Sequence, residues 1–136
     1  MVQGAFMYAL PDDFDVQLLS GCYLEMICFG PSITKLDFSR PQSAPGTTPY
    51  RVSFCIEAGL SYRLAEASGG RKFSDPATCA PLIGLLLHDV TAVTRVGSSS
   101  LELSFGETGI ITIEAGSDAE FESYSIYLNT GDVIVV

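Results

Sequence analysis

Apolar and polar residues alternate along much of this chain. In residues 50–57, YRVSFCIE, every second side chain is large and apolar, and residues 60–66, LSYRLAE, repeat the pattern. Successive side chains of a β-strand point to opposite faces, so a period of two predicts strands with one buried face. Similar apolar runs predict further strands at residues 17–29, 32–38, 90–96, 100–105, 110–115, 121–128 and 132–136.

Glycine and proline separate these strands. Residues 39–49 form the main predicted loop because they contain three prolines and one glycine, and residues 67–76 form a second loop. One helix is expected, beginning between Asp75 and Pro81 and ending near His88, since proline suits an early helical position. The pattern predicts a mainly β fold: an antiparallel curled sheet, an open barrel or a sandwich, with one short helix. An α+β fold is the alternative.

The length of the chain is typical of one domain. We expect a single domain over residues 1–136, with an N-terminal arm of residues 1–15. No apolar run reaches the ~20 residues that span a bilayer, and the first residues lack the basic region of a secretory signal. A cytoplasmic protein is therefore expected.

The cysteines do not form close pairs in the sequence. They are Cys22, Cys28, Cys55 and Cys79. Zinc ligands usually occur in tight pairs, and a domain of this size does not require a disulfide framework. We therefore expect buried, reduced thiols that behave as small apolar side chains.

Acidic residues are concentrated towards the C-terminus. Residues 1–95 contain nine acidic and seven basic residues, whereas residues 96–136 contain seven acidic residues and no lysine or arginine. A negative field repels nucleic acid and anionic membranes and attracts basic surfaces. The charge distribution therefore argues against nucleic acid and membrane as partners and favours a basic protein.

The clearest hairpin lies in residues 101–114, LELSFGETGIITIE. A three-residue loop of residues 107–109 gives Gly109 the position of positive φ and keeps the large apolar residues on one face. This register places Glu102 directly opposite Glu114. Paired carboxylates bind a divalent ion or share a proton, but two glutamates on an exposed sheet offer few metal ligands. We therefore interpret the pair as solvated surface.

Residues 116–124, GSDAEFESY, place further acids at alternate positions beside aromatic residues. Tyrosine is enriched at protein interfaces, so an acidic surface of this kind favours partner binding, with a solubilising loop as the alternative. The candidate partner-binding residues are Glu102, Glu114, Asp118, Glu120, Glu122 and Tyr127. No catalytic residue, metal ligand or cofactor is predicted.

Several short motifs occur in a distinctive order. They are LLSG (18–21), a strand ending in LDF (36–38), PLIGLLLHDV (81–90), the hairpin of residues 101–114 and FESYSIY (121–127). This order resembles the DUF6188 family of small bacterial domains, which has a similar L-x-L-x-F-x-x-x-G-x-I-x-I hairpin followed by a glutamate–serine–aromatic segment. The element order is similar over residues 18–136, and the motifs over the C-terminal third. The resemblance implies no established activity, although some such families resemble immunity proteins that neutralise partner toxins.

Three functions are compatible with these features. The first is a non-enzymatic, acidic binding protein whose C-terminal strands contact a basic protein partner. The alternative is a small-ligand pocket inside an open barrel, lined by Phe54, Tyr62, Phe105 and Tyr124. A metal-dependent enzyme that uses the glutamate pair of the hairpin is the least favoured. An apolar edge strand such as residues 132–136, DVIVV, also allows a homodimer.

Overall fold

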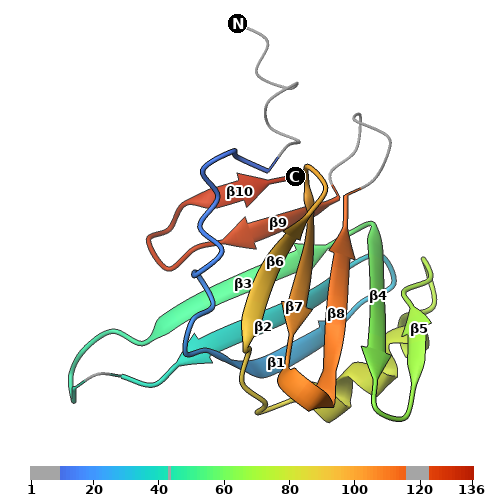
Figure 1. Ribbon diagram of the computed structural model, residues 1–136, viewed down its shortest axis with the longest axis horizontal. Coiled ribbons are helices and arrows are strands. Elements are labelled where there is room, and N and C mark those ends of the chain that lie inside the picture. Colours follow the sequence, from blue (N-terminus) through green and yellow to red (C-terminus); the bar gives the residue numbers. More distant parts are fainter. Residues whose placement is uncertain (1–9, 43, 116–122) are drawn as a thin grey trace, which may run out of the picture.

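Two five-stranded antiparallel sheets form the computed structural model, which describes residues 10–42, 44–115 and 123–136 (Figure 1). The first sheet contains, in spatial order, β1 (Tyr23–Phe29), β2 (Thr34–Arg40), β3 (Tyr50–Ile56), β9 (Tyr124–Tyr127) and β10 (Val133–Val135). The second contains β5 (Ser68–Gly70), β4 (Gly59–Leu64), β8 (Gly109–Glu114), β7 (Ser100–Ser104) and β6 (Ala92–Val96). The predicted helix is the 3₁₀ helix η1 (Pro76–Leu85), and η2 (Gly106–Thr108) is a single turn. The prediction of a mainly β, antiparallel fold with one short helix is confirmed, and of the predicted arrangements the described residues form the sandwich.

The strands of the two sheets cross rather than run alongside one another (Figure 1). The second sheet therefore leaves one side of the first sheet's inner face uncovered. Residues 10–21, which we call the arm segment, run beside β6 over this uncovered side (Figure 1). Leu10, Leu18 and Leu19 of the arm segment are buried. The arm segment, which combines the end of the predicted arm with the start of the predicted first strand, thus closes the core.

Inward-facing residues at alternate positions build the core, as the sequence pattern predicts. Phe54 of β3 is fully buried between neighbouring rings. The ring of Phe38 meets it edge-on, with 5.7 Å between centroids, and Tyr124 stacks on it at 6.5 Å. Burial of each such side chain contributes about 1.5–3 kcal/mol to stability.

Residues 17–21 form turns, not the start of the predicted first strand. The Asp15 carboxylate accepts the backbone N–H of Gln17 at 2.8 Å, and Gly21 has a φ of +76°. These local contacts bend the chain, so that β1 begins only at Tyr23. The apolar residues of the turn are buried without strand pairing, which explains why the run resembled a strand.

The predicted helix has 3₁₀ geometry. Cys79, Leu82 and Leu85 are fully buried at intervals of three residues. Because a 3₁₀ helix has three residues per turn, this spacing places all three side chains on one face, against the core. Pro81 lies inside the helix and lacks the N–H that an α-helical turn uses.

The cysteines are free thiols, but their burial differs from the prediction at Cys28 and, in part, at Cys55. Cys22 and Cys79 are buried and Cys55 is half-buried, whereas Cys28 is exposed. A bulge between Leu24 and Met26 shifts the alternation of β1, so that Cys28 pairs with the outward-facing Lys35. Burial raises the pKa of the other three thiols above their ordinary value of 9.0.

Candidate functional site

The β7–β8 hairpin forms in a register different from the predicted one. Glu102 pairs with Thr112, not with Glu114, a shift of two residues. The loop is residues 106–108, and Gly106 supplies the left-handed conformation with a φ of +66°. A shift of two residues leaves the same side chains facing the core, so the alternation fits both registers. The predicted pairing of the two glutamates is therefore wrong.

Glu102 lies among small polar residues on the outer face of the second sheet. From β6 to β4, its row across the strands is Thr94, Glu102, Thr112 and Ser61. Glu102 is half-buried. Glu114 is exposed, and it lies on β8 two positions after Thr112, the cross-strand partner of Glu102. The Glu114 side chain packs over Gly59 of the neighbouring strand β4. The two carboxylates are diagonal neighbours, which is unsuited to sharing a proton.

The remaining predicted partner-binding residues do not join them. Tyr127 is 47% exposed on the outer face of the first sheet, between Ser53 and Val133. It therefore faces away from Glu102 and Glu114. The other three predicted residues lie outside the described residues: Asp118, Glu120 and Glu122. The predicted set is thus not a single described site.

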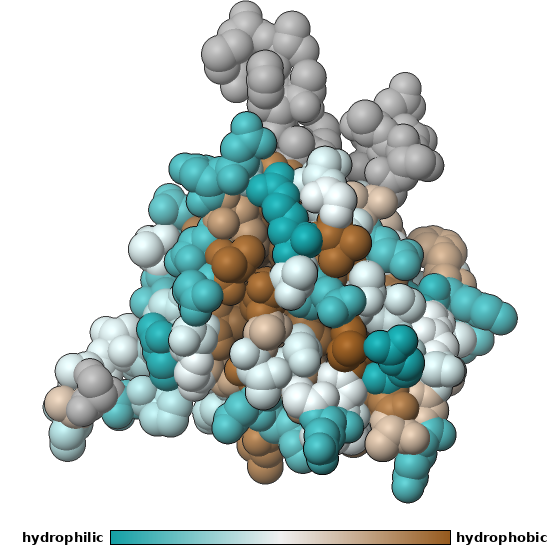
Figure 2. All heavy atoms as spheres, viewed as in Figure 1, coloured by the Kyte–Doolittle hydropathy of each residue, from teal (hydrophilic) through white to brown (hydrophobic). Residues whose placement is uncertain are grey.

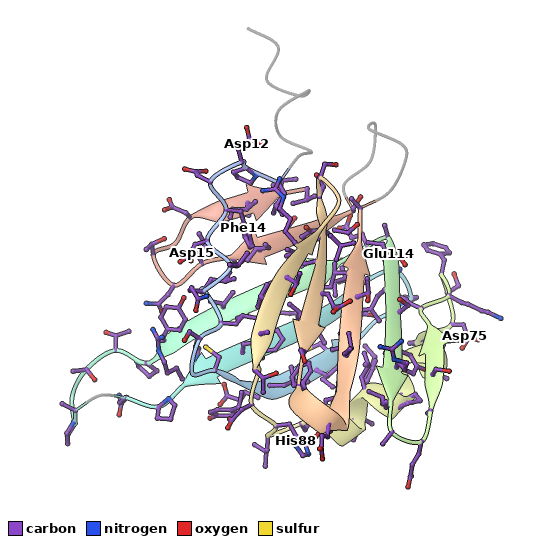
Figure 3. The ribbon with its side chains drawn as sticks, in the orientation of Figure 1. Asp12, Phe14, Asp15, Asp75, His88 and Glu114 are labelled. Atoms are coloured by element: carbon purple, nitrogen blue, oxygen red, sulfur yellow. The ribbon has the colours of Figure 1, made fainter. Side chains whose placement is uncertain are left out.

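A cleft of about 290 Å³ lies between the arm segment and the β9–β10 hairpin, and we call it the arm cleft. Its more apolar lining residues are Pro11, Phe14, Leu18, Tyr50, Leu128 and Ile134. Its polar lining residues are Asp13, Asp15, Asn129 and Thr130. Figure 3 shows Asp12, Phe14 and Asp15 grouped on the arm segment beside β9 and β10. The arm cleft therefore combines an apolar wall with an acidic rim.

Side-chain hydrogen bonds to the backbone position the arm segment. The Tyr50 hydroxyl donates to the carbonyl oxygen of Leu18 at 2.7 Å. At the other end, Arg95 of β6 donates to the carbonyl oxygens of Leu10 and Pro11 at 2.9 and 2.6 Å. These contacts hold the segment over the core although it contains no strand.

The acidic rim is not neutralised within the described part of the chain. Asp13 and Asp15 are exposed, and no ion pair to either is found there. The guanidinium group of Arg40 lies 4.0 Å from the centre of the Tyr50 ring. Burial chiefly raises the pKa of the Tyr50 hydroxyl, and Asp15 adds to the rise while Arg40 opposes it. The hydroxyl therefore stays protonated as the donor that holds the arm segment.

Backbone carbonyls hold three of the arginines. Arg40 donates to Ser20, and Arg71 and Arg95 each donate to several carbonyl oxygens. In the ranges that the structure describes, the ion pairs are Lys35–Asp37 at 3.7 Å and Arg51–Glu25 at 3.9 Å. These three arginines are therefore engaged with the backbone and form no ion pair with the described carboxylates.

Groups suited to catalysis are dispersed. Figure 3 shows Asp75, His88 and Glu114 at separate places, away from the arm cleft. Over residues 10–42, 44–115 and 123–136, no three histidine, cysteine or acidic side chains are grouped so as to hold a metal ion. Within the same ranges, no helix has the length and apolar character needed to cross a membrane.

The residues predicted to line an interior pocket are buried in the core. They are Phe54, Tyr62, Phe105 and Tyr124. The hydroxyls of Tyr62 and Tyr124 donate to the carbonyl oxygens of Thr78 and Ser99, at 2.7 and 2.6 Å. None of the four lines the arm cleft.

No residue of the arm cleft was among the predicted sites. Its sequence signal is PDDFD, residues 11–15, in which three acids flank an aromatic residue. The opposite wall comes from the C-terminal hairpin, far away in the sequence. A local pattern does not reveal that these two segments meet.

The resemblance to the DUF6188 family rests mainly on the hairpin motif. That motif forms β7, η2 and β8 in the structure, as any amphipathic hairpin of this length does. Family membership therefore stays a prediction. Comparisons of the chain with protein-family models, with curated proteins and with solved structures found no match.

Proposed function

We propose that this protein is a non-enzymatic binding protein for a basic protein partner, and that the arm cleft receives a lysine or arginine side chain of that partner. The observation that carries the proposal is an apolar cleft whose rim holds two carboxylates, Asp13 and Asp15, with no ion pair in the described part of the chain. Lysine and arginine have an apolar stem and a cationic head, which match such a wall and rim.

The charge of the whole molecule supports the same partner. The formal net charge is −9, and the outer face of the second sheet adds Glu102 and Glu114. A field of this sign accelerates the approach of a basic partner and is weakened by salt. The family resemblance points to neutralisation of a basic toxin as the biological role, which is part of the proposal.

The test uses synthetic peptides as probes. Pentaarginine and pentacitrulline have similar side chains, but only pentaarginine is charged. The protein should bind pentaarginine, and the double variant Asp13→Asn with Asp15→Asn should weaken binding about tenfold, equivalent to about 1.4 kcal/mol. Affinity is measured by fluorescence anisotropy at low and moderate salt.

The matched control is the double variant Glu57→Gln with Glu66→Gln. It removes two exposed carboxylates outside the arm cleft. An equal loss of affinity in both double variants would mean that the cleft has no special role. Equal binding of pentaarginine and pentacitrulline, or binding of neither, would refute a function based on cationic side chains.

A further inference from the structure

The edge strands of the two sheets are not equally protected. Segment 87–90 borders β1, where Leu24 exchanges backbone hydrogen bonds with Leu87 and His88. Strands β5 and β10 contain only three residues each. By contrast β6 has five residues, and in the described ranges their backbone groups pair with no segment other than β7. Within the described residues, β6 is therefore an edge strand whose outer side is unpaired along its whole length.

β6 has only some of the devices that block strand addition. Proteins protect edges with charged side chains, including inward-pointing ones, with proline, with short strands or by covering the edge with a loop. The outward-facing residues of β6 are Ala92, Thr94 and Val96, which are exposed and uncharged. Arg95 is an inward-pointing charge of the protective kind, and it holds the arm segment near the C-terminal end of β6. The outer face of β6 thus carries no charge against another strand, and space beside the strand is found near Ala92 and Val93.

A slot of about 350 Å³ runs between β6 and the arm segment. Its lining residues are Val16, Gln17, Leu19, Ser20, Gly21, Val90, Thr91, Ala92 and Val93. Figure 2 shows apolar side chains within this recess and hydrophilic ones on both sides. A strand placed beside β6 would direct side chains into the slot at the level of Ala92 and Val93, the β6 residues that line it.

The charges near β6 indicate the chemistry of such a strand. Its outward side chains would extend the row of Thr94 and Glu102. Glu102 would lie two strand spacings away, about 9–10 Å, which a lysine or arginine side chain can span. The same outer face also carries the basic side chain of Arg63. This residue lies on β4, which β8 and β7 separate from β6, so it is far from the added strand.

We propose that β6 binds an extended basic segment of the protein partner, which adds to the second sheet as a sixth strand. In this segment of the partner, lysine or arginine residues alternate with small or apolar residues. The basic side chains lie on the outer face of the sheet, and the small or apolar side chains point towards the slot. This inference rests on the proposed function, because it takes the same basic partner. A second copy of this chain is disfavoured by its net charge of −9.

The experiment uses a seven-residue peptide, acetyl-Lys-Val-Lys-Thr-Lys-Val-Lys-amide. Two isomers carry N-methyl groups at residues 3 and 5 or at residues 4 and 6, and only one of these sets of amides faces β6 in an added strand. One isomer should therefore lose about tenfold or more in affinity while the other retains it. Amide hydrogen exchange of residues 92–96 should slow when the unmodified peptide binds.

A pair of variants locates the binding edge. Thr94→Lys should weaken binding of the unmodified peptide severalfold because it places a positive charge on β6. Ser61→Lys makes the same change on β4, at the other side of the same face, and should have little effect.

Three results would overturn the inference. Equal affinity of both N-methylated isomers would show purely electrostatic binding, which overturns strand addition but leaves the proposed function standing. A concentration-dependent dimer in sedimentation that Thr94→Lys abolishes would assign the edge to a second copy. Binding of neither this peptide nor pentaarginine would overturn both proposals.

Discussion

The β7–β8 hairpin and the arm segment both bury leucines, but they are held by different means. In the hairpin, Leu103 and Ile111 are fully buried as part of a regular ladder between two neighbouring strands. In the arm segment, Leu18 and Leu19 are buried without a ladder, and side chains from β3 and β6 hold the backbone. Packing is thus accompanied by a backbone ladder in the hairpin, but only by a few side-chain hydrogen bonds in the arm segment. The candidate site lies on the segment that is more easily altered.

The largest expected effect comes from removing packing at the hairpin. Leu103→Ala should lower the free energy of unfolding by about 2–5 kcal/mol, because it leaves a cavity between the sheets. Chemical denaturation measures the change. The matched control is Leu87→Ala, at a side chain that is 75% exposed, which should change stability by less than about 0.5 kcal/mol. Similar losses in both variants would contradict the assignment of Leu103 to the core.

A second test concerns Gly109, predicted to be a turn residue and found instead at the start of β8. A Cβ atom there would lie 2.9 Å from the carbonyl oxygen of Arg63 on the neighbouring strand. Gly109→Val should therefore destabilise the fold by about 3 kcal/mol through overpacking and backbone strain. Gly84→Ala, where an added Cβ meets nothing within 4 Å, is the control. An unchanged melting temperature for Gly109→Val would refute the observed pairing with β4.

The arm segment should respond to the loss of a single arginine. Arg95→Met removes the hydrogen bonds to Leu10 and Pro11 and should lower stability by about 1–3 kcal/mol. Hydrogen exchange of residues 10–21 should accelerate much more than that of β7 and β8. Arg63→Met, on the exposed outer face, should leave the arm segment unchanged. If hydrogen exchange accelerated equally over the whole chain, the proposed difference between the arm segment and the β7–β8 hairpin would be contradicted.

Alkaline pH is expected to have the smallest effect. Burial raises the pKa of Tyr124 above its ordinary value of 10.0, so the folded state favours the neutral phenol. The stability that this provides is fully present below pH 10 and is lost as the pH rises through the folded-state pKa. Tyr124→Phe should therefore flatten the fall in unfolding free energy above pH 10, measured by denaturation at several pH values. An identical slope in both proteins would contradict this.

Much of the fold could be predicted from the alternation of apolar and polar residues. The structure departs from that prediction where a turn or a bulge interrupts a predicted strand. The strand over residues 50–57 matches β3 closely because its inward residues are all apolar. The strand expected from residue 17 begins at Tyr23, since Asp15 and Gly21 shape turns that outweigh the apolar run. Cys28 is exposed because a bulge reverses the alternation in β1. The residues that form the turns can be recognised in the sequence, whereas the bulge depends on pairing with the neighbouring strand.

The candidate site was less predictable than the fold. Glu102 and Glu114 were correctly placed on a polar face, but their pairing was wrong because a shift of two residues preserves every inward side chain. The acids of PDDFD were visible, while the cleft beside them was not. Its second wall comes from the β9–β10 hairpin, which folds against the arm segment only in three dimensions.

The amino-acid sequence by itself determined most of the buried side chains, where most strands lie and where negative charge accumulates. These properties depend on residue type and on a period of two, both of which are local. The tertiary structure decided the hairpin register, the crossing of the sheets, the open edge at β6 and the arm cleft. Each of these depends on contacts between segments distant in the chain, which no local period specifies.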